Sequence, residues 1–199
     1  MDSVDQAYVD AIVGVFDVAV ERFTQRLDGL TDDELLWEPV AGCWTVRPDA
    51  TGAWVCDGDR TGGLAVAPVT TIAWRMTHLA CHAIGGFATW LCDGGMPFEG
   101  DPDVPHTATG ALAALHRNWR RWREGMVALE LSRWRQPIGE AFGAHGEAST
   151  TDLVLHVLDE VVHHAAEVSL LRDLYAARPL RDGAPSPPPP RSASSRPSR

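Results

Sequence analysis

The chain has 199 residues, 45% of them hydrophobic, which is enough for one domain with a sizeable hydrophobic core. Its formal net charge is −10, and five of its seventeen cationic side chains lie near the C-terminal end: Arg178, Arg181, Arg191, Arg196 and Arg199. The rest of the chain is therefore more acidic still, and such a body repels a phosphate backbone, which disfavours nucleic-acid binding.

The first expected element is a long amphipathic helix over residues 4–28. Apolar residues recur there at intervals of three and four, from Val9 to Leu27, and Gly29 is the expected stop signal. Residues 31–68 are rich in Gly, Pro and Asp and show no clear periodicity, so we expect an irregular connection. A connection this long is uncommon and often functional, although its segment DDELLW could add one short helix.

A second helix is predicted over residues 70–92, with Thr70 or Thr71 as its N-cap. It is apolar nearly all round, which is typical of a helix buried on more than one side. After a loop, the pattern predicts a third helix over about residues 107–129.

Residues 131–148 have an irregular pattern, and a fourth helix is expected over residues 149–175, capped by Ser149, Thr150 or Thr151. Four long helices with no convincing strand between them predict an all-α fold, namely a four-helix bundle with long connecting loops. In such bundles, metal and cofactor sites are built from inward side chains on facing helices.

The end of the chain, residues 178–199, is rich in Pro and Ser and is expected to be a disordered tail, so that the domain itself spans residues 1–177. The sequence has no run of about 18 apolar residues that could cross a bilayer, and its start lacks a charged segment followed by an apolar one. We therefore expect a cytoplasmic protein that does not bind membranes.

Two further absences limit the chemistry. The sequence contains no lysine, which excludes Schiff-base chemistry and a Walker lysine on this chain. Its four cysteines stand in no C-x-x-C spacing, so we expect neither a zinc ribbon nor a thioredoxin-like motif, but small buried apolar side chains: Cys43, Cys56, Cys81 and Cys92.

The fourth predicted helix carries acid and imidazole groups among its apolar residues. His164 falls inside the apolar arc, and Glu160 lies at its edge one turn earlier. The two form an E-x-x-x-H pair whose side chains can reach one point beside the helix. A buried carboxylate is costly unless it is paired or binds a metal, so the pair is either a hydrogen bond in the bundle interior or part of a metal site.

A third ligand would have to come from another helix, and the second predicted helix offers His78 and His82. Each alone is more often a core histidine than a ligand. With Glu160 and His164, either would complete a His-Glu-His set, the chemistry of an open zinc site or a similar divalent site. Helical periodicity cannot separate His78 from His82, because that helix is apolar on most sides.

The other polar residues of the fourth helix are not predicted as ligands. His163 lies well outside the apolar arc and is expected at the surface. His156, Asp159 and Glu167 are candidates for hydrogen-bond partners that orient the ligands.

The segments TTIAWRMTHLACH and LVLHVLDEVVHHAAEVSLLRDLY resemble the DinB-like superfamily of four-helix metalloproteins. They are similar to its branch with mycothiol-dependent S-transferases and the metal domain of mycothiol-dependent maleylpyruvate isomerase, over about residues 5–177. The resemblance implies a divalent metal held by His78, rather than His82, together with Glu160 and His164. Several relatives carry a further histidine where this chain has Glu167.

The resemblance also implies a function. A divalent metal, zinc in the first place and nickel as the alternative, would activate a low-molecular-weight thiol of the mycothiol type for S-transfer to, or isomerisation of, a small electrophilic substrate. Such an enzyme would serve detoxification or specialised metabolism. The alternatives are a non-catalytic DinB-like metal-binding module of the stress response, and an apo bundle whose polar pair only fixes helix register. Two-fold association through exposed tryptophan faces would give a homodimer.

Overall fold

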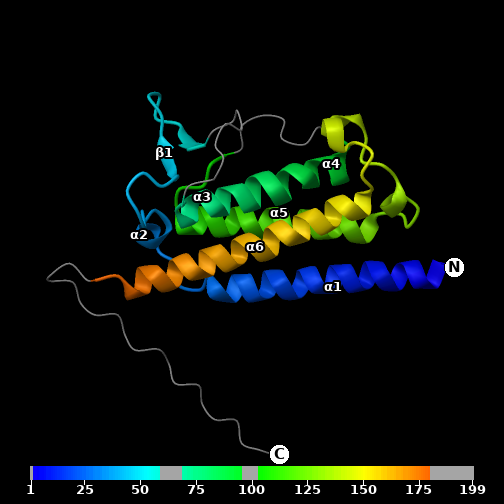
Figure 1. Ribbon diagram of the computed structural model, residues 1–199, viewed down its shortest axis with the longest axis horizontal. Helices are drawn as coiled ribbons and strands as arrows, with labels where there is room; N and C mark the ends of the chain where they lie inside the picture. The colour runs from blue at the N-terminus through cyan, green and yellow to red at the C-terminus, as the bar shows by residue number, and fades with distance from the viewer. Residues whose placement is uncertain (1, 59–68, 96–102, 180–199) are drawn as a thin grey trace, which may run out of the picture.

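The computed structural model describes residues 2–58, 69–95 and 103–179. Within them, four long helical segments lie side by side as a bundle (Figure 1), which confirms the predicted all-α fold. The expected tail beyond residue 179 and part of the irregular stretch at residues 31–68 lie outside the described residues.

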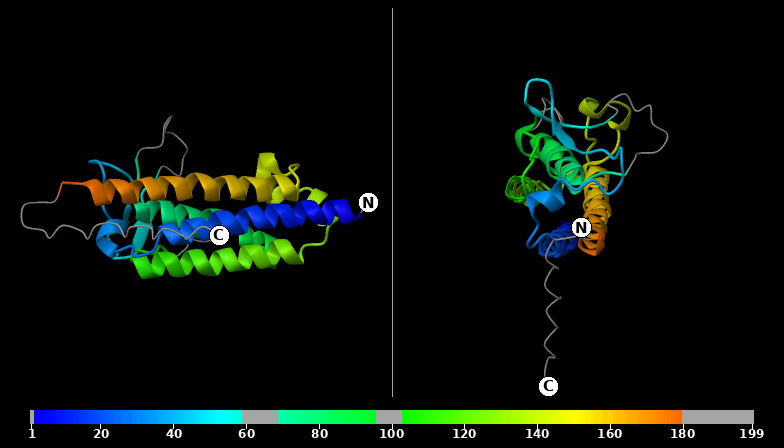
Figure 2. Two further views of the ribbon diagram at one scale, coloured as in Figure 1. Left: turned by 90° about the horizontal axis from the view of Figure 1, so that it is seen from below. Right: turned by 90° about the vertical axis from the view of Figure 1, so that its left-hand side faces the viewer.

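The bundle consists of α1, a composite second segment, α5 and α6. Its elements are α1 (Asp2–Arg26), α3 (Ile72–Thr77) continued by η1 (His78–Gly86) and α4 (Phe87–Asp93), α5 (Ala108–Ala128) and α6 (Thr150–Ala177). Helices α1 and α6 run in one direction, and the composite segment and α5 run in the other (Figures 1 and 2).

The core lies where the apolar stripes of these helices meet. The stripe of α1 and that of α6 follow the predicted spacing of three and four residues and are buried: Val9, Val13, Phe16, Val20 and Phe23 on α1, continued by Leu27 just after it, and Leu153, Val154, Val157, Val161, Val168 and Leu171 on α6. His164 is buried within the second stripe, as its position in the arc predicts.

The structure shows which of the predicted residues cap the helices. Thr71 is the N-cap of α3 and accepts a hydrogen bond from the backbone N–H of Trp74. Ser149 caps α6 and forms a reciprocal capping box with Asp152. Helix α1 ends at Arg26, three residues before Gly29, which has a positive φ of 71°.

The sequence pattern predicts one regular α-helix for the second segment. The structure differs, because η1 is a π-helix. Such wider turns are rare and often lie at functional sites. Asn118 on α5 donates a hydrogen bond from Nδ2 to the carbonyl of Ala80 inside η1, at 2.8 Å. Gly85 leaves room for that side chain, since a Cβ there would lie 2.8 Å from Nδ2 of Asn118. The π-helix is thus fitted to one polar side chain of α5.

The prediction that no strand is present is wrong for residues 46–56. Strand β1 (Val46–Pro48) pairs antiparallel with β2 (Trp54–Cys56), with Val46 opposite Cys56. Oδ1 of Asp49 accepts hydrogen bonds from the backbone N–H groups of Thr51 and Ala53, which closes the turn. Strands of three residues are too short to show an alternating pattern, so the hairpin depends on this turn.

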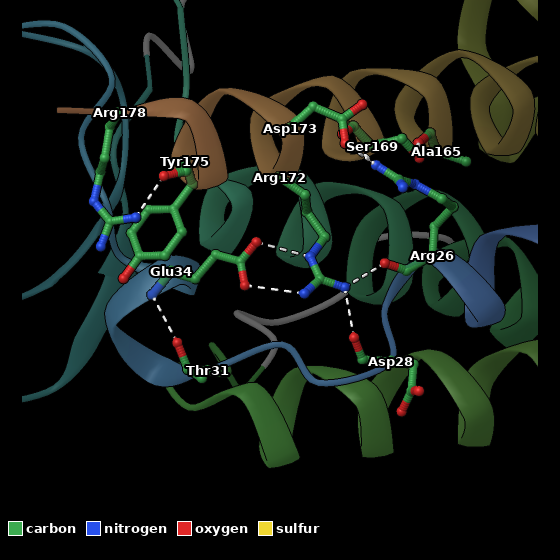
Figure 3. A network of polar contacts seen from close by, with 10 residues as sticks. All are labelled: Arg26, Asp28, Thr31, Glu34, Ala165, Ser169, Arg172, Asp173, Tyr175 and Arg178. Atoms are coloured by element: carbon green, nitrogen blue, oxygen red, sulfur yellow. Dashed lines mark hydrogen bonds and ion pairs between the residues drawn. The ribbon is translucent and has the colours of Figure 1, made fainter. Parts of the chain in front are cut away.

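A buried ion pair fastens the end of α1 to α6 (Figure 3). Short helix α2 (Asp32–Leu35), predicted from DDELLW, carries Glu34, whose two carboxylate oxygens lie 2.8 and 3.0 Å from Nε and Nη2 of Arg172 on α6. Nη1 of Arg172 also donates to the carbonyl of Arg26, the last residue of α1, and to that of Asp28 just after the helix. Arg172 therefore caps α1 while it neutralises Glu34.

One expectation about side chains is corrected. Of the four cysteines, all free, only Cys43 is buried, and Cys92 is exposed. All eight tryptophans lie in the described residues; Trp122 and Trp134 are buried and the other six are partly exposed. A homodimer through tryptophan faces stays a prediction. Among the described helices, none has the length and apolarity needed to cross a membrane.

Candidate metal centre

Three side chains converge at the contact between the second helical segment and α6. His78 is the first residue of η1, and Glu160 and His164 lie one turn apart on α6. One ligand atom of each lies within 4.8 Å of the others. The structure therefore brings together the three residues predicted as ligands, and their binding of a metal stays a prediction.

The carboxylate of Glu160 is the centre of this cluster. Its Oε2 atom lies 3.0 Å from Nε2 of His78 and 3.0 Å from Nε2 of His164. The two imidazole rings stand perpendicular, at 89°, with centroids 4.8 Å apart. The His164 side chain is 9% exposed, that of Glu160 is 22% exposed and that of His78 is 32% exposed, so His164 is the most buried of the three and His78 the most accessible.

The charges of this cluster support one another. Hydrogen bonds with His164 and with His78 hold the pKa of Glu160 well below its usual range, against the effect of burial. Burial lowers the pKa of His164, but its hydrogen bonds with Glu160 and Glu167 together raise it above the usual value. Hydrogen bonds between the carboxylate and the two imidazoles thus hold the cluster together, and a metal ion that bound there would displace the protons that they use.

The donor set fits a divalent metal. Two imidazole nitrogens and one carboxylate oxygen are ligands of zinc and of related divalent ions. The carboxylate is already ionised, and the three atoms already face one another. Three protein ligands rather than four are typical of a catalytic metal site, which leaves a coordination position for water or substrate.

The remaining candidates of the sequence lie around this cluster. His82 is not one of its three members; its ring centroid lies 6.2 Å from that of His78. His156 is exposed, and its Nε2 lies 3.9 Å from Oε1 of Glu160. Asp159 and His163 are exposed, the latter as predicted.

Glu167 is the residue that supports His164. Its Oε2 lies 2.6 Å from Nδ1 of His164 and 2.9 Å from Nε of Arg75 on α3. The sequence indicated Glu167 as one of three candidates for a residue that orients the metal ligands, and it missed Arg75. Only the position of Arg75, one turn before His78 on the same helix, could have drawn attention to it.

Aromatic side chains pack beside the ring of His78. The ring of Trp74 stacks against that of His78 at 5.3 Å and 11°, and Nε1 of Trp74 donates to the carbonyl of Asp57 at 2.6 Å. The ring of Trp44 lies 5.6 Å from that of Trp74. The hairpin region therefore fixes Trp74, and Trp74 limits the rotation of the His78 ring. The spacing of four residues between Trp74 and His78 was the available signal.

Comparison with known proteins gives one match. The family model described as DinB superfamily matches residues 16–168, which is most of the chain and includes all three residues of the cluster. No curated protein and no solved structure matches the chain.

Proposed function

The chain belongs to the DinB superfamily, and from this premise we propose that it is a divalent-metal-dependent enzyme that activates a low-molecular-weight thiol. The thiol is of the mycothiol type, the metal is zinc or nickel, and the reaction is S-transfer to, or isomerisation of, a small electrophile. The observation that carries the proposal is the convergence of His78, Glu160 and His164 from two helices.

A metal held by these three ligands supplies Lewis acidity, which keeps a thiol deprotonated near neutral pH. The rest follows from the chain's own side chains. Glu160 brings one negative charge to the site, and buried His164 restricts water on the α6 side. The partly exposed edge of His78 is where small molecules have access to the site.

The thiol is expected to come from outside the chain. Burial raises the pKa of Cys56 and that of Cys81, each to about 11, so neither thiol is ionised near neutral pH. Cys43 also has a raised pKa because of its burial. A nucleophilic sulfur at this site therefore belongs to a substrate.

The test measures metal content and thiol chemistry together. Protein purified with zinc supplied is analysed for metal, then mixed with mycothiol, glutathione or cysteine and a fluorogenic electrophile. We expect one metal per chain and metal-dependent consumption of mycothiol, which His164→Ala abolishes and His163→Ala leaves intact. His163 is the matched control, because it is the adjacent histidine on the exposed side of α6.

Two results would separate the proposal from its alternatives. A metal-loaded protein that consumes none of the thiols contradicts the enzyme and favours the non-catalytic metal-binding module. A protein that takes up no metal when zinc or nickel is supplied contradicts both and leaves an apo bundle.

A further inference from the structure

Beside the ligand cluster lies a second group of potential ligands. His163, His164 and Glu167 each offer an atom within 4.8 Å of the other two. Two interpretations compete. The group either holds a second metal ion, or it supports His164 from behind.

Arg75 decides against a second metal. Its Nε lies 2.9 Å from Oε2 of Glu167, the same oxygen that lies 2.6 Å from Nδ1 of His164. The Arg75 side chain is only 14% exposed, so little water screens its charge. An arginine is always protonated. A second cation on this oxygen would therefore face a fixed positive charge at close range.

The contact between Glu167 and His164 also fixes which ring nitrogen carries the proton. An ionised carboxylate only accepts hydrogen bonds, so Nδ1 of His164 must be the donor. In a neutral ring, Nε2 is then the nitrogen with the free lone pair. Nε2 is the atom that faces Glu160 and His78.

The ion pair connects the two helices that supply the ligands. Arg75 stands three residues before His78 on α3, and Glu167 stands three residues after His164 on α6. The pair therefore links the same two helices that a metal would link, one turn away. It holds them at the spacing that the three ligands need.

We propose that Glu167 is a positioning residue for the metal centre. It orients His164 and fixes its tautomer, Arg75 holds Glu167 in place, and the group of His163, His164 and Glu167 binds no metal of its own. The inference rests on the metal site of the proposed function and is independent of the thiol reaction.

His163 provides the matched control. Its Nε2 lies 3.3 Å from Oε1 of Glu167, but the side chain is 59% exposed. It contacts the carboxylate from the solvent side, and its ring lies edge-on to that of His164 at 4.8 Å, a contact that involves neither Arg75 nor the Oε2 atom of Glu167. Loss of His163 therefore leaves the chain from Arg75 through Glu167 to His164 intact.

The experiment compares metal binding in the wild type, Glu167→Ala, Glu167→Gln, Arg75→Gln and His163→Ala. Zinc affinity is measured by competition with a chelator, and the absorption spectrum of the cobalt-substituted protein reports ligand geometry. We expect Glu167→Ala to weaken zinc binding by about 10- to 100-fold, as for other outer partners of metal ligands. The Gln variant should lose less, because its amide oxygen still accepts from Nδ1. His163→Ala should match the wild type in affinity, in spectrum and in a stoichiometry of one.

The tautomer of His164 is the decisive readout, because it would not change if Glu167 only stabilised the fold. Nitrogen-15 NMR of the metal-free protein, at a pH where the ring is neutral, is expected to show the proton on Nδ1 in the wild type and in Glu167→Gln, and a mixed population in Glu167→Ala. If Glu167→Ala fails to fold, Glu167→Gln and Arg75→Gln carry the same comparison.

Three results would overturn the inference. They are two metals per chain with one lost in His163→Ala, wild-type zinc affinity in Glu167→Ala, or an unchanged tautomer in that variant. A wild type that binds one metal but consumes no thiol defeats the proposed enzyme alone. A wild type without metal defeats the metal site, and the tautomer in the apo protein then decides whether Glu167 positions His164.

Discussion

Nε2 of His78 and Oε2 of Glu160 lie 3.0 Å apart, although 82 positions separate the two residues in the chain. The contact joins the junction of α3 and η1 to the middle of α6. It is one of the contacts that define the candidate site, and a second contact from His164 meets the same oxygen.

Replacement of Glu160 by Gln should remove most metal binding. The variant keeps the shape of the side chain but loses the negative charge that a divalent ion needs, so zinc affinity should fall by more than the roughly 100-fold upper limit for outer partners. Metal content after dialysis against a weak chelator measures the effect. The control is Asp159→Asn, which removes a charge from the neighbouring exposed position. Equal metal loss in both variants would show a general charge effect instead of ligation.

His78 and His82 can be separated by single substitutions. His78→Ala should lose the bound metal, because Nε2 of His78 faces Glu160 at 3.0 Å. His82→Ala should keep it, since His82 lies outside the three-residue cluster. Elemental analysis of both variants, purified side by side, provides the measurement. If His78→Ala keeps the metal and His82→Ala loses it, His82 and not His78 is the ligand.

Arg172→Met should destabilise the fold strongly. It leaves the carboxylate of Glu34, 7% exposed, without its partner (Figure 3), and breaking a buried pair in this way costs about 3–5 kcal/mol. Urea denaturation measures the free energy of unfolding. Arg26→Ala serves as the control: it breaks the exposed pair with Asp173 and should cost less than about 1 kcal/mol.

The double variant Glu34→Leu with Arg172→Met tests the reason for that loss. If the unpaired carboxylate causes it, the double variant should be more stable than Arg172→Met alone. Recovery should be incomplete, because the carbonyls of Arg26 and Asp28 still lack their donor. A double variant as unstable as the single one would place the whole loss in the carbonyl contacts.

Cysteine reactivity should follow exposure and pKa. At pH 8 a thiol with a pKa of about 11 is ionised in only about one molecule in a thousand, and the thiolate is the reactive form. Cys56 and Cys81, whose pKa values burial raises to about 11, should therefore resist iodoacetamide until the pH rises toward that value. Exposed Cys92 should be alkylated first. Peptide mass spectrometry after timed labelling gives the order, and rapid labelling of Cys56 at pH 8 would contradict it.

The sequence predicts the part of the site that one helix determines. Glu160 and His164 share a face because four residues make about one helical turn, and this relation does not depend on the rest of the fold. His78 could not be chosen over His82 from the pattern, since the second segment is apolar nearly all round and includes the π-helix η1. A periodicity of 3.6 residues does not describe such turns.

The supporting residues depend on contacts between elements. Glu167 could be named as a candidate because it shares a helix with His164, but Arg75 is an ordinary charged residue in the sequence, and only the packing of α3 on α6 makes the two partners. The hairpin of β1 and β2 was missed for another reason, because each strand has three residues and the turn at Asp49 provides most of the local order. Both cases are tertiary or very short-range effects, to which hydrophobic periodicity is insensitive.

Different contacts hold the two parts of the second helical segment, α3 before His78 and the π-helix η1 that begins at His78. His78 stands at the boundary between the regular turns of α3 and the wider turns of η1. Its place beside α6 is therefore set by the regular turns before it, which Thr71 caps and Arg75 ties to Glu167. The turns behind it are held separately, by Asn118 of α5. Changes in η1 near its contact with Asn118 can accordingly reshape the surroundings of the site, while the turns of α3 still place the histidine that faces Glu160.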